Sequence, residues 1–155
     1  MERIASFTVD HDVLTPGLYL SRRDGHVTTF DLRFKKPNTG DLLSNAEMHS
    51  VEHVIATLLR NSRHKDAVIY FGPMGCQTGF YFLFDGAQLT DAQAIELLKS
   101  VFFAAAFYEG TMPGNTAREC GNYINLDLEL AKKCCFAYTN VIGKWTEEQL
   151  VYPVK

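Results

Sequence analysis

Two histidines and a glutamate stand close together in the segment HSVEH, as His49, Glu52 and His53. On a helix, at about 100° per residue, the three side chains share one face. Two imidazoles four residues apart on such a face can bind one metal ion, and a glutamate beside them can exchange a proton with a bound water or substrate. The alternative is the solvated face of an ordinary surface helix. We interpret the H-x-x-E-H pattern as a candidate metal site.

A further ligand for that site is available in the loop that contains Cys120. Open catalytic metal sites usually have three protein ligands and leave one position for water or substrate. Gly121 follows Cys120 and lets the backbone fold close to an ion. The alternative for this thiol is packing in the core. Cys134 and Cys135 are weaker candidates, because neighbours on a helix diverge by about 100°. We predict that these two are small packing residues.

Another thiol, Cys76, lies in the glycine-rich turn GPMGCQTG between two expected strands. Gly75 and Gly79 permit backbone conformations that other residues avoid and let a ligand approach. Beside a divalent cation the ionised form of such a thiol would be favoured, and it could act as a base near neutral pH. The alternative is a turn cysteine without a function.

A helix from residue 44 to about residue 63 is expected to carry the H-x-x-E-H segment. SNAE at its start is a capping box, in which Ser44 caps the first turn and Glu47 reaches back to it. The apolar residues fall on the side opposite the histidines and predict the face that packs into the core. They are Met48, Val51, Val54, Ile55, Leu58 and Leu59.

A β-hairpin is predicted for 17–34, turning at Asp24 and Gly25. In its second strand, apolar residues alternate with polar ones, so one face is apolar and the other polar. The apolar set is Phe30, Leu32 and Phe34, and the polar set is Thr29, Asp31 and Arg33. On this pattern alone, Arg33 is expected to be an exposed, solubilising charge.

The remaining segments predict two more strands and two more helices. The strands are expected at 67–72 and 79–86, and the helices at 90–110 and near 126–139. Hairpins and helices without regular βαβ alternation indicate an α+β fold, with an antiparallel β-sheet packed against a few α-helices. We expect one domain over 1–155, because the length suits a single core.

Composition limits the partners and the location of the chain. A net charge of -3 and a pI near 5.9 give no reason to expect nucleic acid or an anionic membrane as partner. No apolar run follows the N-terminal charges, so no secretory signal is expected. The longest apolar stretch, 101–108, is far shorter than the roughly 20 residues of a membrane span. We therefore expect a cytoplasmic protein with reduced cysteines.

Taken together, these motifs resemble the S-ribosylhomocysteine lyase (LuxS) family, which makes the precursor of autoinducer-2, a quorum-sensing signal. The matching segments occur in the family's order over most of the chain. They are SFTVDH (6–11), FDLRFKKPN (30–38), HSVEH (49–53), PMGCQTGFY (73–81) and ECG (119–121). H-x-x-E-H alone is shared with inverted-motif zinc metallopeptidases. The alternative is therefore a small peptidase in which Glu52 activates a water and Glu119 or Glu129 is the third ligand.

The resemblance implies cleavage of S-ribosylhomocysteine to homocysteine and 4,5-dihydroxy-2,3-pentanedione, by carbonyl migration and β-elimination. It also implies one divalent metal per subunit, ferrous iron in the active form with zinc or cobalt able to replace it, and a homodimer with active sites at its interface. The implied residues are His49, His53 and Cys120 for the metal, Glu52 and Cys76 for acid and base catalysis, and Ser6, His11, Arg33 and Arg60 for substrate binding.

One short segment departs from the family pattern. Many members have an acidic residue two places before the serine-proline pair that precedes MGC. Here Tyr70 stands at the acidic position, and Gly72 replaces the serine. The departure concerns how the homocysteine amino group is held, and it leaves the metal chemistry unaffected.

Overall fold

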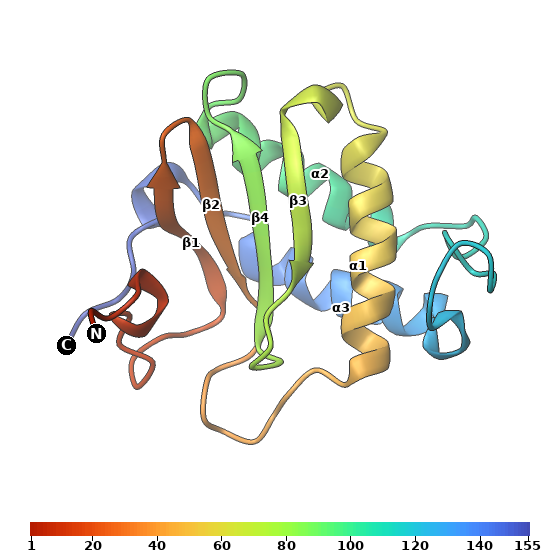
Figure 1. The fold of residues 1–155 in the computed structure, drawn as a ribbon, viewed down its shortest axis with the longest axis horizontal. Helices are drawn as coiled ribbons and strands as arrows, with labels where there is room; N and C mark the ends of the chain where they lie inside the picture. The colour runs from red at the N-terminus through yellow and green to blue at the C-terminus, as the bar shows by residue number, and fades with distance from the viewer.

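Four antiparallel strands form one sheet in the order β1-β2-β4-β3 in the computed structural model (Figure 1). The structure describes residues 1–155 apart from the side chain of Ala5. The strands are β1 (Gly17–Asp24), β2 (Val27–Arg33), β3 (Val68–Pro73) and β4 (Gly79–Asp85), and the helices are α1 (Asn45–Arg60), α2 (Asp91–Ala106) and α3 (Leu128–Ile142). The helices α2 and α3 lie behind the sheet, and α1 runs alongside β3. The predicted α+β fold with an antiparallel sheet is confirmed.

The predicted hairpin and both later strands are present close to their expected limits. Asp24 pairs with Val27, and Gly25 between them has a φ of 61°, in the left-handed region that glycine adopts without strain. β2 then pairs with β4, and β3 with β4, both in antiparallel register. The turn between β3 and β4 carries Cys76, as predicted.

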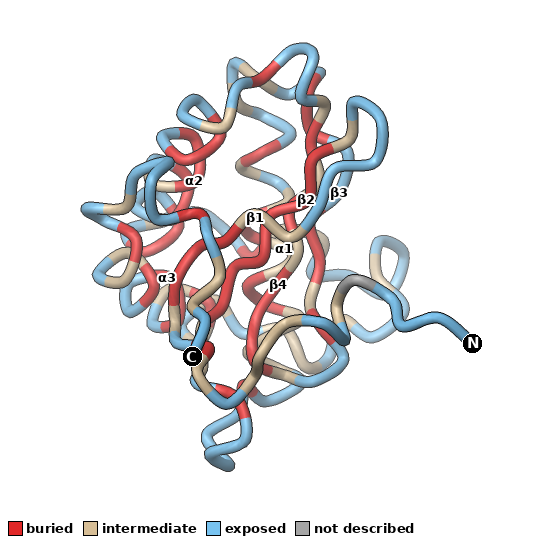
Figure 2. The backbone as a smooth tube through the Cα atoms, turned by 90° about the vertical axis from the view of Figure 1, so that its left-hand side faces the viewer, coloured by how far each residue is buried: buried red, intermediate tan, exposed pale blue. Residues whose placement is uncertain are grey.

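The apolar face of β2 packs against the helices, as its alternation predicted. Phe30 and Leu32 are fully buried. Phe34 stacks on Tyr138 of α3, with ring centroids 4.0 Å apart, and Phe102 of α2 meets the Tyr138 ring edge-on at 4.8 Å. Buried residues therefore follow the strands and the inner sides of α2 and α3 (Figure 2). This aromatic contact fixes the sheet to the two helices.

The polar face of β2 is also buried, and the expectation of an exposed Arg33 is wrong. The side chains of Asp31 and Arg33 are 1% and 3% exposed. A strand pattern shows which residues share a face but cannot show what covers that face. Here the N-terminal segment and the C-terminal tail cover it, since Ser6, Val9 and Tyr152 line the same cavity as Arg33.

Helix α1 begins at the predicted capping box and ends three residues before the predicted end. The Ser44 hydroxyl accepts from the Glu47 N–H at 3.1 Å, and the Glu47 carboxylate accepts from the Ser44 N–H at 2.7 Å. Loss of such a cap costs about 1 kcal/mol. The helix stops at Arg60 because the Asn61 side chain donates to the Thr57 carbonyl and closes the last turn.

The other two helices also differ from the prediction at their ends. Helix α2 begins after Thr90, which forms a capping box with Gln93, but ends at Ala106 rather than 110. Gly110 makes room for the ring of Tyr108, whose hydroxyl donates to the Thr111 carbonyl, instead of capping the helix. Helix α3 is capped by Asp127 and extends to Ile142.

The apolar stretch 101–108 lies mostly in α2 and packs into the core through Val101, Phe102, Ala105 and Ala106. Cys134 and Cys135 are buried in the same core, as predicted.

Across the described chain, every helix falls short of the length and apolar character that a membrane crossing requires.

Candidate active site

Three predicted metal ligands, His49, His53 and Cys120, come together beside α1. Each offers one donor atom, and these atoms lie within 4.8 Å of one another. The Cys120 sulfur lies 3.3 Å from His49 Nε2. The two imidazole rings are perpendicular, with centroids 4.6 Å apart. Helix α1 supplies the histidines, and the segment between α2 and α3, which lies beside α1 on the side away from β3, brings the cysteine (Figure 1).

Each histidine is oriented by a hydrogen bond at its other ring nitrogen. His49 Nδ1 donates to the Asn125 side-chain oxygen at 2.6 Å, and His53 Nδ1 donates to the Pro113 carbonyl at 2.8 Å. A proton on Nδ1 leaves the Nε2 lone pair free for a cation, which is the usual arrangement around histidine ligands. The loop that carries Cys120 therefore also fixes the tautomers of the helix histidines.

Gly114 allows this loop to approach His53. Its φ is 67°, and a Cβ placed on it would lie 2.8 Å from His53 Nδ1, closer than packed atoms approach. Only glycine suits both the backbone conformation and the space. The sequence TMPGN between α2 and α3 thus has a packing role that its spacing did not reveal.

The donor set fits a divalent cation. Two imidazoles and one thiolate bind iron, cobalt or zinc, and three protein ligands leave a fourth position for water or substrate. The donors converge from two segments of the chain, and their orienting hydrogen bonds are already made. The residues present could therefore hold a metal ion.

Glu52 lies beside this cluster rather than within it. It lines a groove of about 310 Å³ together with His53, Pro113 and Gly114. A carboxylate at the edge of an open groove next to a metal can take a proton from a group bound there and return it. The group of converging donor atoms consists of His49, His53 and Cys120 and does not include Glu52.

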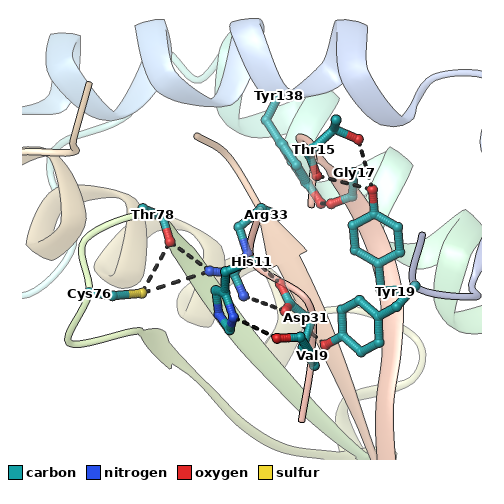
Figure 3. Close-up of polar contacts among 11 residues, drawn as sticks. Val9, His11, Thr15, Gly17, Tyr19, Asp31, Arg33, Cys76, Thr78 and Tyr138 are labelled. Atoms are coloured by element: carbon teal, nitrogen blue, oxygen red, sulfur yellow. Dashed lines mark hydrogen bonds and ion pairs between the residues drawn. The ribbon is translucent and has the colours of Figure 1, made fainter. Parts of the chain in front are cut away.

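Four other predicted residues line a second cavity, of about 420 Å³, above the sheet. They are Ser6, His11, Arg33 and Cys76. The Cys76 sulfur lies 3.1 Å from the Thr78 hydroxyl and 3.8 Å from Arg33 Nη1 (Figure 3). A cavity that holds an exposed thiol next to a cation suits a small ligand with polar groups and a proton-transfer step.

Arg33 is held in this cavity by a buried ion pair with Asp31. Nη2 and Nε of Arg33 donate to the two carboxylate oxygens at 2.5 Å and 3.2 Å. Burial lowers the pKa of the Arg33 guanidinium, but the charge and hydrogen bonds of Asp31 outweigh burial and raise this pKa, so Arg33 stays a cation.

The metal cluster and the Cys76 cavity are separate within one chain. Of the described residues, none lines both the groove at Glu52 and the cavity at Cys76. Arg60 lines neither of them: it donates to the backbone carbonyls of Val68 and Ile69 from the end of α1. The structure thus brings the predicted residues together as two groups and leaves Arg60 outside both.

Several residues that shape these two groups were missed by sequence reasoning. Asn125 and the Pro113 carbonyl orient the histidines, and Tyr152 donates to Asp31 at 2.8 Å. Each contact joins positions at least 60 residues apart, so it cannot be predicted from the spacing of residues within a short segment. The sequence pattern indicated only one part of this network, because it placed Asp31 on the same polar strand face as Arg33.

The departure at Tyr70 and Gly72 has a structural basis. The Tyr70 ring lies along the strand over Gly72, and any Cβ at position 72 would overlap the ring. Tyr70 lines a neighbouring cavity of about 310 Å³. Two other residues that line this cavity, Ser6 and Tyr81, also line the Cys76 cavity. A tyrosine at 70 therefore goes together with a glycine at 72 in this chain.

Comparison with known proteins shows the family of this chain. The family model described as S-Ribosylhomocysteinase (LuxS) matches residues 4–149. Proteins named S-ribosylhomocysteine lyase from Finegoldia magna, Clostridium beijerinckii and Desulfotalea psychrophila are 44%, 43% and 47% identical to this chain, over 99% of its length and of theirs. These relatives lend no support to the metallopeptidase alternative. The chain belongs to the S-ribosylhomocysteinase (LuxS) family.

Proposed function

We propose that this chain is a metal-dependent S-ribosylhomocysteine lyase, and that residues 1–155 form one such domain. The products are homocysteine and 4,5-dihydroxy-2,3-pentanedione. One observation carries the proposal: in a member of this family, His49, His53 and Cys120 converge while Glu52 lies alongside. We further infer a cytoplasmic enzyme that contributes to autoinducer-2 synthesis.

His49, His53 and Cys120 would hold one divalent cation per subunit. Their donor set accepts iron, cobalt and zinc alike, and the family resemblance favours ferrous iron. When bound, the cation supplies Lewis-acid polarisation of the sugar carbonyl, which acidifies the neighbouring C–H bond. The orienting contacts from Asn125 and Pro113 keep both imidazoles in place for that task.

Glu52 and Cys76 would move the protons. The carbonyl passes from C1 to C2 and then to C3 when a carbon-bound proton is removed at each stage and a proton is returned to the adjacent carbon. Once the carbonyl stands at C3, the sulfur on C5 is β to it. Loss of the C4 proton then forms a C4–C5 double bond as the C–S bond breaks, and homocysteine leaves with the electron pair and takes up a proton. The enol that remains gains a proton at C5 and loses its hydroxyl proton, which gives the dione. The sequence of steps has no net oxidation or reduction.

Ser6, His11 and Arg33 would bind the substrate next to Cys76, since all four line one cavity. Arg33 is a fixed cation that can donate to sugar oxygens. Arg60 is the remaining substrate residue that the resemblance implies. It would have to release its two carbonyl bonds to reach the homocysteine end.

A homodimer would complete the site. The proton-transfer residues Glu52 and Cys76 lie in different cavities of one chain. Asp31 and Tyr81, which line the Cys76 cavity, pair on the sheet face opposite the buried Phe30, and neither α1, α2 nor α3 covers that face (Figure 1). Tyr70, 49% exposed, lies on the same face. A second copy packed there would join the Cys76 cavity of one subunit to the metal cluster of the other.

The test is the release of homocysteine from S-ribosylhomocysteine, followed with a thiol reagent after anaerobic purification and metal analysis. We expect metal-dependent release of homocysteine, with one metal bound per chain. A metal-loaded protein that releases no homocysteine would refute the lyase assignment. Removal of the metal with a chelator, followed by separate addition of ferrous iron, cobalt and zinc, identifies which ion supports turnover.

A further inference from the structure

Tyr152 enters the Cys76 cavity from the C-terminal tail. The tail is fixed beside β1, because the Leu20 N–H donates to the Leu150 carbonyl at 2.8 Å. The Tyr152 ring stacks on Tyr19, with centroids 5.1 Å apart and planes 23° from parallel. From there its hydroxyl donates to Asp31 at 2.8 Å, across 121 positions of sequence. No step of the proposed reaction has used this contact.

The Asp31 carboxylate is buried and accepts three hydrogen bonds from two residues. Arg33 supplies two of them and Tyr152 the third. Burial raises the pKa of Asp31, while Arg33 and Tyr152 act to lower it. Burial and then the charge of Asp31 raise the pKa of Tyr152, so its phenol keeps the proton and remains a donor.

The ion pair fixes which edge of the Arg33 guanidinium faces Cys76. The guanidinium is planar, so anchoring Nε and Nη2 on one carboxylate also fixes the direction of Nη1. Nη1 then donates to the Thr78 hydroxyl at 2.6 Å and lies 3.8 Å from the Cys76 sulfur (Figure 3). Any change that lets the Asp31 side chain move therefore also lets Arg33 Nη1 turn away from the Cys76 sulfur.

We propose that Tyr152 is a positioning residue, which holds the Asp31 carboxylate in place so that the paired Arg33 guanidinium keeps facing the Cys76 sulfur. The inference rests on the proposed function, in which Cys76 exchanges protons with the substrate. Tyr152 acts through Asp31 and does not touch the thiol. The C-terminal tail thereby becomes part of the active site.

Other titratable or charged groups around the thiol must be considered with this pair. His11, from the N-terminal segment, shares two cavities with Cys76. Tyr81, from β4, lines one of them, and burial raises its pKa, so it is neutral at physiological pH. Of the described groups that line these cavities with Cys76, Arg33 is the fixed cation and Asp31 the fixed anion.

The test compares Tyr152→Phe with Tyr19→Phe in the metal-loaded protein. Both changes remove one hydroxyl and keep the stacked rings, but the Tyr19 hydroxyl donates to the Thr15 carbonyl and not to Asp31. The readouts are the rate of Cys76 alkylation by iodoacetamide from pH 6 to 9, followed by peptide mass, and kcat and KM for S-ribosylhomocysteine. For Tyr152→Phe we expect alkylation at pH 6–7 and kcat to fall about tenfold. The alkylation rate should approach that of the parent protein at pH 9, where thiols ionise without help from a neighbouring cation.

Two outcomes would overturn the proposal. One is a Tyr152→Phe protein that behaves like Tyr19→Phe, and the other is a loss of the same size at every pH, which indicates a structural defect. Asp31→Asn gives a second check, since Tyr152→Phe should add nothing to it if Tyr152 acts through Asp31. Should Asp31→Asn fail to fold, the comparison of the two tyrosine variants still decides. Alkylation needs no substrate, so an absence of lyase activity would refute the proposed function without deciding the role of Tyr152.

Discussion

The two halves of the candidate site are built in different ways. The metal cluster depends on one helix: His49 and His53 are fixed by their spacing on α1, and a single loop adds Cys120 with its orienting contacts. The Cys76 cavity draws on the N-terminal segment, β2, the turn between β3 and β4, and the C-terminal tail. The two histidines of the first half can be recognised from local spacing, whereas the second half exists only after distant segments have packed together.

The electrostatics of the two halves differ as well. Around the metal cluster the ligand side chains are partly exposed, and contacts from the neutral Asn125 side chain and Pro113 carbonyl orient the two imidazoles. Around Cys76 a buried ion pair supplies fixed charges. A buried pair of this kind is costly to break, because removal of one partner leaves an uncompensated charge. The metal half thus requires a bound metal ion for its positive charge, whereas the Cys76 half has the positive charge of the Arg33 guanidinium.

The largest effect is expected from changing one proton-transfer residue in each half. Glu52→Gln and Cys76→Ala should each lower kcat by about 10²- to 10⁴-fold, the usual contribution of a general acid or base. Metal content should remain at one ion per chain, since neither residue belongs to the ligand set. The measurements are the thiol-release rate and metal analysis on the same preparation. Full activity in either variant would remove that residue from the mechanism, and loss of metal would make it a ligand.

Mixing the two inactive variants tests whether the halves meet across a dimer. In a mixed dimer of Glu52→Gln and Cys76→Ala chains, one shared site contains both mutations and the other contains neither. After subunits are exchanged by refolding together, activity should recover to about a quarter of the parent value. Each variant refolded alone is the control. If both halves of a site came from one chain, every site would keep a defect and the mixture would stay inactive.

A smaller effect is expected from loosening the support of a ligand. Asn125→Ala removes the acceptor from His49 Nδ1 and should weaken metal affinity about 10- to 100-fold, as is usual for such orienting partners. Competition with a chromophoric chelator measures it. Asn122→Ala is a matched control, because its backbone N–H rather than its side chain contacts the Cys120 sulfur. Equal affinities for the two variants would mean that Asn125 does not position His49.

The smallest effect is expected at the edge of the Cys76 half. Gly72→Ala places a methyl group where the Tyr70 ring lies, and the ring is exposed enough to swing away. The stability cost should be below about 1 kcal/mol, since the group that moves is the end of a flexible side chain. KM for S-ribosylhomocysteine should change while kcat stays nearly constant. The Tyr70→Ala background is the control: if Gly72→Ala shifts KM equally there, the effect does not pass through the ring.

Most of the fold could be predicted from local patterns, and the errors lie at element ends and covered faces. Helix α1 ends at Arg60 because the Asn61 side chain closes the last turn, and Gly110 accommodates Tyr108 instead of ending α2. Both outcomes depend on side-chain contacts that periodicity does not contain. The alternation of polar and apolar residues correctly predicts that Arg33 lies on the face of its strand opposite Phe30 and Leu32. What covers that face is decided by segments far away in sequence.

The sequence by itself determined the α+β class, the helix with His49, Glu52 and His53 on one side, and the family motifs, because periodicity and spacing act over a few residues. Tertiary structure alone decided that Cys120 reaches His49, that Asn125 and Pro113 orient the histidines, and that Asp31, Arg33 and Tyr152 form one buried network. Apart from the pairing of Arg33 with Asp31, these contacts join residues 60 or more positions apart. Their geometry arises only when the whole core packs, since no short stretch of chain can specify it.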